Sequence, residues 1–155
     1  MKILVVSDSH KKLNNLVDIY NLEKPDIVIS AGDYFRDCEE LSHIYPDSRY
    51  FYVPGNCDFF PGKLKEELFV YIHPFKFFIT HGHLYHVKRT YDTIKEKGKL
   101  LQANVIICGH THKKLLEKFD NITIFNPGAA VNGDYGIINI NDSNIEFLQK
   151  VLSNI

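Results

Sequence analysis

Short apolar segments recur along the first two thirds of the chain, and polar residues follow each of them. The segments are dominated by β-branched, aliphatic or aromatic side chains, which is typical of strands buried on both faces of a sheet. Their uninterrupted apolar character favours parallel pairing in the middle of a sheet. The predicted strands of this type are 3–6, 26–30, 50–53 and 105–108.

Segments with a helical pattern of apolar residues lie between these predicted strands. Leu13, Leu16, Val17 and Tyr20 recur at i, i+3, i+4 and i+7, which predicts a helix that ends before Pro25. The same pattern predicts two further helices. One carries Cys38, Leu41 and Tyr45, and the other carries Val87, Tyr91 and Ile94 and closes at Gly98.

The remaining segments alternate or run as short strands without a clear helix. We expect a hairpin across 66–80 with its turn near Pro74, and further strands at 115–119, 122–125, 137–140 and 145–148. Strands and helices that alternate before a strand-rich tail predict an α/β fold with mixed sheets. With 155 residues, the whole chain 1–155 is expected to form a single domain.

Charge and composition narrow the classes of function. The formal net charge is −1, so we do not expect binding to extended duplex nucleic acid, which needs many neutralising cations. Six lysines between 95 and 118 favour a solvated face, with an anion-binding face as the alternative. Three widely spaced cysteines and the lack of a long apolar segment predict free thiols, no membrane span and a cytoplasmic location.

Polar side chains lie where the predicted strands end. They combine carboxylate, amide and imidazole groups, a ligand set that suits borderline divalent ions. Side chains at i and i+2 of an extended segment point the same way, so each such pair is expected to converge on one ion. Glycines beside these residues predict sharp turns. The segments are Asp8-x-His10, Gly32-Asp33, Gly55-Asn56, His81-Gly82-His83 and Gly109-His110-x-His112.

The order of these five segments resembles the calcineurin-like metallophosphoesterase superfamily, from Asp8 to about Gly128. Segments 55–58, 80–83, 109–112 and 126–128 are most similar to the small YfcE-type phosphodiesterases within it. The resemblance implies a four-layer αββα sandwich of two mixed β-sheets flanked by helices. It also implies two bound divalent metal ions, with manganese expected and nickel, iron or zinc as alternatives.

The resemblance assigns each polar residue a role. Asp8, His10 and His112 would bind the first ion, Asn56, His81 and His110 would bind the second, and Asp33 would bridge the two. Asp33, Asn56, His81 and His83 form the expected catalytic set. His83 falls outside the ligand positions, so it would either line the phosphate pocket or hold a ligand imidazole.

The function implied is hydrolysis of a small phosphodiester by a hydroxide that bridges the two ions. Two divalent ions bring four positive charges, Asp8 and Asp33 remove two and hydroxide removes one, so a diester monoanion would neutralise the site. Many superfamily members carry a histidine where this chain has Cys57. A thiol is a poor proton donor to a leaving alkoxide, which predicts a preference for good leaving groups.

Several alternatives stay open at this stage. A protein-interaction scaffold resembling the Vps29-like retromer subunit has this fold but lacks parts of the metal set, and a small nuclease of the Mre11 type shares the ligands. Tyr34, Phe35, Phe59 and Phe60 flank the metal loops, and loop packing is favoured for them over stacking on a nucleotide-like substrate. The sequence leaves a homo-oligomer open.

Overall fold

The computed structural model describes residues 1–153 and contains two five-stranded sheets. The first sheet has the order β10-β9-β1-β2-β3. Its strands β1, β2 and β3 are parallel, whereas β9 is antiparallel to β1 and β10 is antiparallel to β9. The bounds are β1 (Lys2–Val6), β2 (Ile27–Ser30), β3 (Arg49–Tyr52), β9 (Asp134–Asn141) and β10 (Asn144–Val151).

The second sheet has the order β4-β5-β6-β8-β7. Strands β5, β6 and β8 are parallel, and the edge strands β4 and β7 are antiparallel to their neighbours. Both sheets are therefore mixed, as the sequence predicts. The bounds are β4 (Glu67–Ile72), β5 (Phe75–Thr80), β6 (Val105–Ile107), β7 (Leu115–Phe119) and β8 (Ile122–Asn126).

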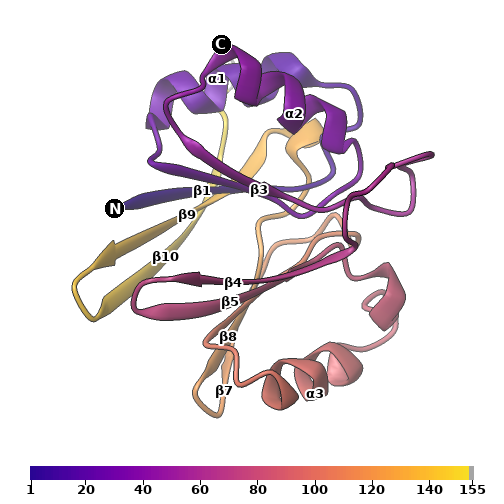
Figure 1. The fold of residues 1–155 in the computed structure, drawn as a ribbon, viewed down its shortest axis with the longest axis vertical. Coiled ribbons are helices and arrows are strands. Elements are labelled where there is room, and N and C mark those ends of the chain that lie inside the picture. The colour runs from indigo at the N-terminus through magenta and orange to yellow at the C-terminus, as the bar shows by residue number, and fades with distance from the viewer. Residues whose placement is uncertain (154–155) are drawn as a thin grey trace.

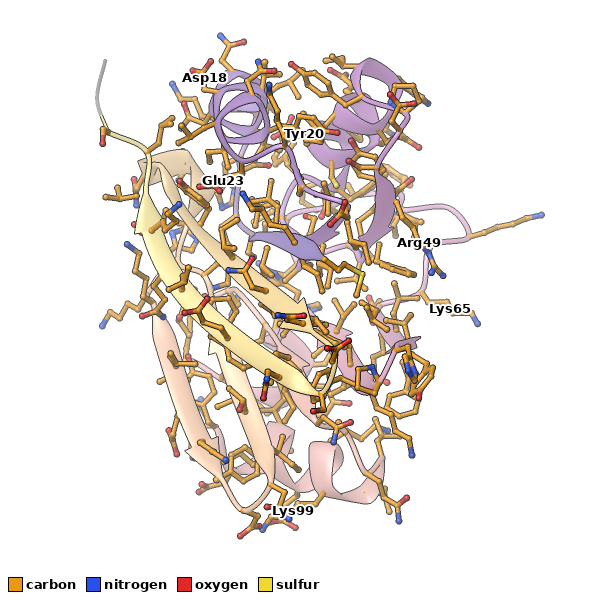
Figure 2. The ribbon with its side chains drawn as sticks, turned by 90° about the vertical axis from the view of Figure 1, so that its left-hand side faces the viewer. Asp18, Tyr20, Glu23, Arg49, Lys65 and Lys99 are labelled. Carbon is orange, nitrogen blue, oxygen red and sulfur yellow. The ribbon has the colours of Figure 1, made fainter. Side chains whose placement is uncertain are left out.

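The two sheets pack face to face and helices cover their outer surfaces (Figure 1). Helices α1 (Leu13–Glu23) and α2 (Phe35–Ile44) lie on the first sheet, and α3 (Asp92–Leu100) lies on the second. Tyr20 and Glu23 belong to α1 at the upper end of Figure 2. This arrangement confirms the predicted four-layer αββα sandwich. Two 3₁₀ helices, His83–Tyr85 and Ala130–Asn132, are the additional elements.

Alternation along each central strand explains the layers. Ile3 and Val5 point into the core between the sheets, whereas Leu4 and Val6 pack against the helices. In β6, Val105 faces the inter-sheet core and Ile106 faces α3. Each such fully buried aliphatic side chain contributes roughly 1.5–3 kcal/mol of hydrophobic stabilisation, so both faces of the central strands must be covered.

Helix α3 differs from its predicted extent. The sequence pattern begins at Val87, but the helix begins at Asp92 and continues through Gly98, where the prediction ends it. A Cβ atom at position 98 would collide with the Ile106 side chain, so this glycine allows close helix–sheet contact rather than termination. Val87 is buried in the loop that precedes the helix.

The parallel strands of each sheet present their carboxyl ends at one edge, where ligands gather in open α/β sheets. The five polar segments follow β1, β2, β3, β5 and β6. Across residues 1–153, no helix combines the length and apolar character needed to span a membrane.

Candidate metal centre

The first group of converging side chains joins Asp8, His10, Asp33 and His112. One nitrogen or carboxylate oxygen from each lies within 4.8 Å of the others. Nε2 of His112 is 3.1 Å from Oδ1 of Asp8, and Nε2 of His10 is 3.7 Å from Oδ2 of Asp33. Both carboxylates are buried and both imidazoles are partly exposed, so one side of the group opens to solvent.

The second group joins Asp33, His81 and His110, again with ligand atoms within 4.8 Å of one another. The amide oxygen of Asn56 lies 3.1 Å from Nε2 of His81, which adds a fourth donor. Asp33 belongs to both groups. The structure thus brings together all seven residues that the resemblance marks as ligands, in two groups that share one carboxylate.

The loops that carry these residues are left-handed rather than extended. Asp8, His10, Asp33, His110 and His112 have φ between 44° and 68°. The extended-loop argument for pairing i with i+2 is therefore wrong as a mechanism, because His110 and His112 join different groups. Such backbone conformations cost about 1–3 kcal/mol each and persist where the surrounding structure holds them.

Two glycines allow the loops to approach one another. A Cβ atom at Gly109 would collide with the Ser7 hydroxyl, and one at Gly55 would collide with the Asp33 carboxylate. Neither of these glycines has a positive φ, so their role is close approach rather than the sharp turn predicted from the sequence.

The tautomer of His81 follows from its hydrogen bond to Ala31. Nδ1 lies 2.7 Å from the carbonyl oxygen of Ala31, and because a carbonyl can only accept, Nδ1 carries a proton. Nε2 then faces Oδ2 of Asp33 at 3.4 Å. In the neutral ring, the lone pair of Nε2 therefore points at the lone pairs of the Asp33 carboxylate. A cation or a second proton between these atoms would stabilise the arrangement.

The pKa shifts of His81 and Asp33 also indicate that positive charge is stabilised at this position. Burial alone would lower the pKa of His81, but the hydrogen bond that its ring donates to Asp33 and the charges of Asp8 and Asp33 outweigh burial and raise the pKa. Burial alone would raise the pKa of Asp33, but the hydrogen bond and charge of His81 and the Cys57 amide lower it. The centre therefore favours an ionised Asp33 carboxylate with a positive charge beside it.

Asp8 provides a direct test of whether a metal ion fits. Its Oδ2 accepts hydrogen bonds from the Ser7 hydroxyl at 2.6 Å and the His110 amide at 3.1 Å. Its Oδ1 is buried and accepts no hydrogen bond from the described residues. A buried carboxylate oxygen without a donor is costly unless a cation meets it. The donor set and this oxygen both fit a divalent ion.

His110, a member of the second group, and His83, which lies beside it, are both neutral imidazoles. Burial and the positive charges of His81 and Lys88 lower the pKa of His110 to about 4. Burial and His81 also lower the pKa of His83. The Nδ1 atom of His83 is buried and finds no hydrogen-bond partner within residues 1–153. His81 is held by Ala31, so His83 does not hold that ligand imidazole.

Cys57 lies beside Asp33 with its backbone amide donating to Oδ1 at 2.9 Å. Burial and the negative charge of Asp33 raise the pKa of the thiol. The thiol therefore stays protonated and is a weak acid. Cys38, Cys57 and Cys108 are all free, in agreement with the sequence prediction.

Asp58 is a positioning residue that the sequence analysis missed. Its Oδ1 accepts hydrogen bonds from the amides of Tyr34 and Phe35 at 2.9 and 3.1 Å, and its Oδ2 accepts one from Gly55 at 2.7 Å. The first pair forms the N-terminal cap of α2, where no local side chain caps the helix. Asp58 thus ties the loop after Asp33 to the loop before Asn56. Its adjacency to Asn56 was the available signal.

We expect Asp58→Ala to lower kcat/KM of the metal-loaded protein about 10–100-fold, the range seen when residues that orient metal ligands are removed. Three backbone amides would lose their acceptor, and the Asp33 and Asn56 loops would separate. Steady-state kinetics and metal titration measure the effect. Asp18→Ala, at an exposed aspartate on α1 (Figure 2), is the matched control. Equal kinetics in both variants would contradict the positioning role.

The predicted lysine face is divided by ion pairs. Lys95 pairs with Glu117 at 2.5 Å, Lys99 pairs with Asp120 at 3.4 Å and Lys114 pairs with Asp134 at 2.9 Å. Lys99 lies at the end of the molecule opposite α1 (Figure 2). Three of the six lysines are thus compensated by a neighbouring carboxylate, which agrees with the favoured interpretation of a solvated face.

The four aromatic residues near the centre do not share one environment. Phe35 is buried and stacks with Tyr52, as packing predicts. Phe59 and Phe60 are 77% and 91% exposed, so the packing prediction is wrong for both. They lie in the loop between β3 and β4, which extends away from the sandwich in Figure 1.

Comparisons with known proteins agree with this geometry. A family profile described as "Calcineurin-like phosphoesterase superfamily domain" matches residues 1–140. The chain is 34% identical to a Bacillus subtilis protein named "Probable metallophosphoesterase YsnB" over 133 residues, covering 83% of this chain and 75% of that protein. It is 32% identical to "Phosphodiesterase MJ0936" of Methanocaldococcus jannaschii over 152 residues, covering 84% of each.

A solved structure of a Vps29 mutant from Entamoeba histolytica is also similar, with a TM-score of 0.81 and 23% identity. The match covers 99% of this chain and 94% of that chain. At this identity the likeness shows a shared fold alone.

Proposed function

The chain belongs to the calcineurin-like phosphoesterase superfamily, and on that premise we propose that it hydrolyses small phosphodiesters at a centre that binds two divalent metal ions. The observation that carries the proposal is the position of Asp33, whose carboxylate is shared by two groups of ligand-type side chains. A single structural ion would need only one such group.

The chain's own residues would divide as follows. Asp8, His10 and His112 would hold one ion, Asn56, His81 and His110 would hold the other, and Asp33 would contribute to both. When bound, two such ions activate water at neutral pH and stabilise the charge that develops on the phosphoryl oxygens. Manganese is the expected metal, with nickel, iron and zinc as alternatives.

The protein fixes the ligands before any ion or substrate arrives. Ala31 orients His81 through Nδ1, and Ser7 orients Asp8 through Oδ2, so the remaining lone pairs point into the centre. Pre-oriented ligands lower the reorganisation needed for catalysis. The neutral His83 imidazole lies near His81 and His110, with ring centroids 5.4 and 6.1 Å away. We assign this half-buried imidazole to the phosphate pocket.

The charge expected at the metal-loaded centre and the name of one relative both favour phosphodiesters over monoesters as substrates. The Methanocaldococcus relative is named a phosphodiesterase. Within the centre, Asp8 and Asp33 are the two carboxylates, which leaves a modest positive excess once two divalent ions are bound. A diester monoanion matches a small excess better than a monoester dianion.

The leaving group receives little help from Cys57. Its thiol proton has a raised pKa and is held beside Asp33, so transfer to a departing oxygen is unfavourable. We therefore propose that the substrates have good leaving groups, such as aryl or nucleotide-phosphate esters. The scaffold alternative is supported only by the fold that the chain shares with the Vps29 structure.

Metal analysis tests the proposal directly. We expect the purified protein to bind two divalent ions per chain and to hydrolyse bis(4-nitrophenyl) phosphate only when they are present. A metal at 100 times its Kd stabilises the folded state by about 2.7 kcal/mol. The melting temperature should therefore fall by roughly 5–10 °C when chelator removes the ions, at about 2–4 °C per kcal/mol.

His110→Ala separates the two ions. It should remove the ion of the second group, leave one ion per chain and lower the turnover of the aryl diester, since Asp8, His10 and His112 remain. Two ions bound without hydrolysis of mono- or diesters would redirect the assignment to a scaffold. Failure to bind any divalent ion would overturn the proposal.

A further inference from the structure

A cavity of about 560 Å³ is lined in part by the loop that carries His110 and His112. One wall is the segment 87–91, which leads into α3, and the other is formed by 111 and 113–115. Thr111 lies between His110 and His112 in sequence, so one loop carries both a wall residue and two candidate ligands. The volume falls within the range of about 300–1,000 Å³ that is usual for small-molecule sites.

The cavity is strongly positive in a protein whose net charge is −1. Lys88, Arg89 and Lys113 line it, are exposed, and have no ion-pair partner within residues 1–153. Lys114 also lines it but is paired with Asp134 at 2.9 Å. No aspartate or glutamate is among the lining residues. A concave surface lined by one sign of charge concentrates anions.

The remaining lining residues suit a substrate rather than a free ion. Val87 is buried and Leu115 is half-buried, so they supply an apolar floor. The Thr111 hydroxyl is fixed by a hydrogen bond from Nδ2 of Asn126 at 3.0 Å, which holds the wall. The Arg89 guanidinium offers the planar, bidentate donor geometry that phosphate oxygens match.

We propose that this cavity binds a second phosphate group of the substrate, so that the substrate class is a phosphodiester carrying an additional phosphomonoester. This inference rests on the proposed function, because it takes the scissile diester to lie at the metal centre. Three uncompensated cations provide enough positive charge to bind one phosphomonoester dianion. The apolar floor can contact the sugar or ring that links this phosphate to the diester. They are too few for the many phosphate contacts of an extended duplex.

A matched substrate pair tests the cavity through turnover. The 4-nitrophenyl ester of thymidine 5′-phosphate is compared with the same ester bearing a 3′-phosphate, so the leaving group is constant. In the wild-type protein kcat/KM should be about tenfold higher for the phosphorylated ester, the gain expected from one charge-assisted contact. In the triple variant Lys88→Ala, Arg89→Ala, Lys113→Ala the ratio should fall to about one.

The control variant removes an equal number of positive charges at positions outside the cavity. The triple variant Lys24→Ala, Arg49→Ala, Lys118→Ala changes one arginine and two lysines that are exposed and lie outside the cavity. Arg49 is labelled in Figure 2. This variant should keep the wild-type ratio. An equal loss in both triple variants, or no preference in the wild-type protein, would overturn the inference.

A binding measurement separates this inference from the proposed function. Thymidine 3′,5′-bisphosphate and thymidine 5′-phosphate are titrated into the protein in chelator, and Kd is measured by calorimetry or NMR. The bisphosphate should bind about tenfold more tightly, and the cavity variant should lose this difference. If no diester is hydrolysed but the difference in Kd is present, the function proposal fails and the cavity assignment stands. If diesters are hydrolysed but neither assay shows a preference for the additional phosphate, the cavity assignment is wrong and the proposed function stands.

Discussion

Replacing Asp33 with alanine is expected to lower kcat for bis(4-nitrophenyl) phosphate by at least about 10³-fold, or about 4 kcal/mol of transition-state stabilisation. Asp33 is the residue whose side chain enters both ligand groups, so its loss affects both proposed ions. Its carboxylate also accepts the Cys57 amide, which helps to hold the loop of Asn56. We expect the number of bound ions to fall from two to one or fewer, as measured by elemental analysis.

The variant Asp33→Asn distinguishes loss of the negative charge from loss of the hydrogen-bond acceptor. The amide oxygen can still accept the hydrogen bond from Cys57, so the loop should stay in place while the negative charge is lost. We expect a loss of activity close to that of Asp33→Ala, with a melting temperature near that of the metal-free wild-type protein. Asp47→Ala, at an exposed aspartate outside the centre, is the control. Asp33 variants that retained two ions and wild-type turnover would remove the basis of the dinuclear proposal.

The buried central strands could be predicted from the sequence because their apolar segments are uninterrupted, whereas the layers came from the family resemblance. Ile3 and Leu4 face opposite layers, and an apolar residue at each position is what a doubly covered strand requires. The start of α3 could not be predicted in this way. Val87 fits the helical period but packs from a loop, and Gly98 is a contact residue rather than a stop.

The centre could be located from the sequence, but its geometry could not. Polar residues after strands marked the ligand set, and the family resemblance assigned His110 and His112 to different ions, but the left-handed backbone at each was not predicted. No local pattern encodes that conformation for histidine. Asp58 and the cation pair Lys88 and Arg89 were missed for a related reason. Their roles come from contacts between loops. For Asp58 the sequence offered only its position two residues after Asn56, and for Lys88 and Arg89 it offered no signal.

Cys57→His is expected to raise the hydrolysis of diesters with poor leaving groups by about 10²-fold, the lower end of what general acid catalysis contributes. The substrates are thymidine 5′-aryl phosphates whose leaving phenols range in pKa from about 7 to about 10. In the wild-type protein the rate should fall steeply across this series, because the thiol is a weak acid held beside Asp33. In Cys57→His an imidazolium at the same position could protonate the departing oxygen, so the slope should flatten.

Two features of the site make this test selective. The contact between residue 57 and Asp33 uses the backbone amide, which any substitution other than proline retains, so the Asp33 loop should not move. Cys57→Ala removes the thiol without supplying an acid and should keep the steep wild-type slope. A wild-type series in which rate is nearly independent of the leaving-group pKa would show that a proton donor already acts there. That outcome would contradict the expected preference for good leaving groups.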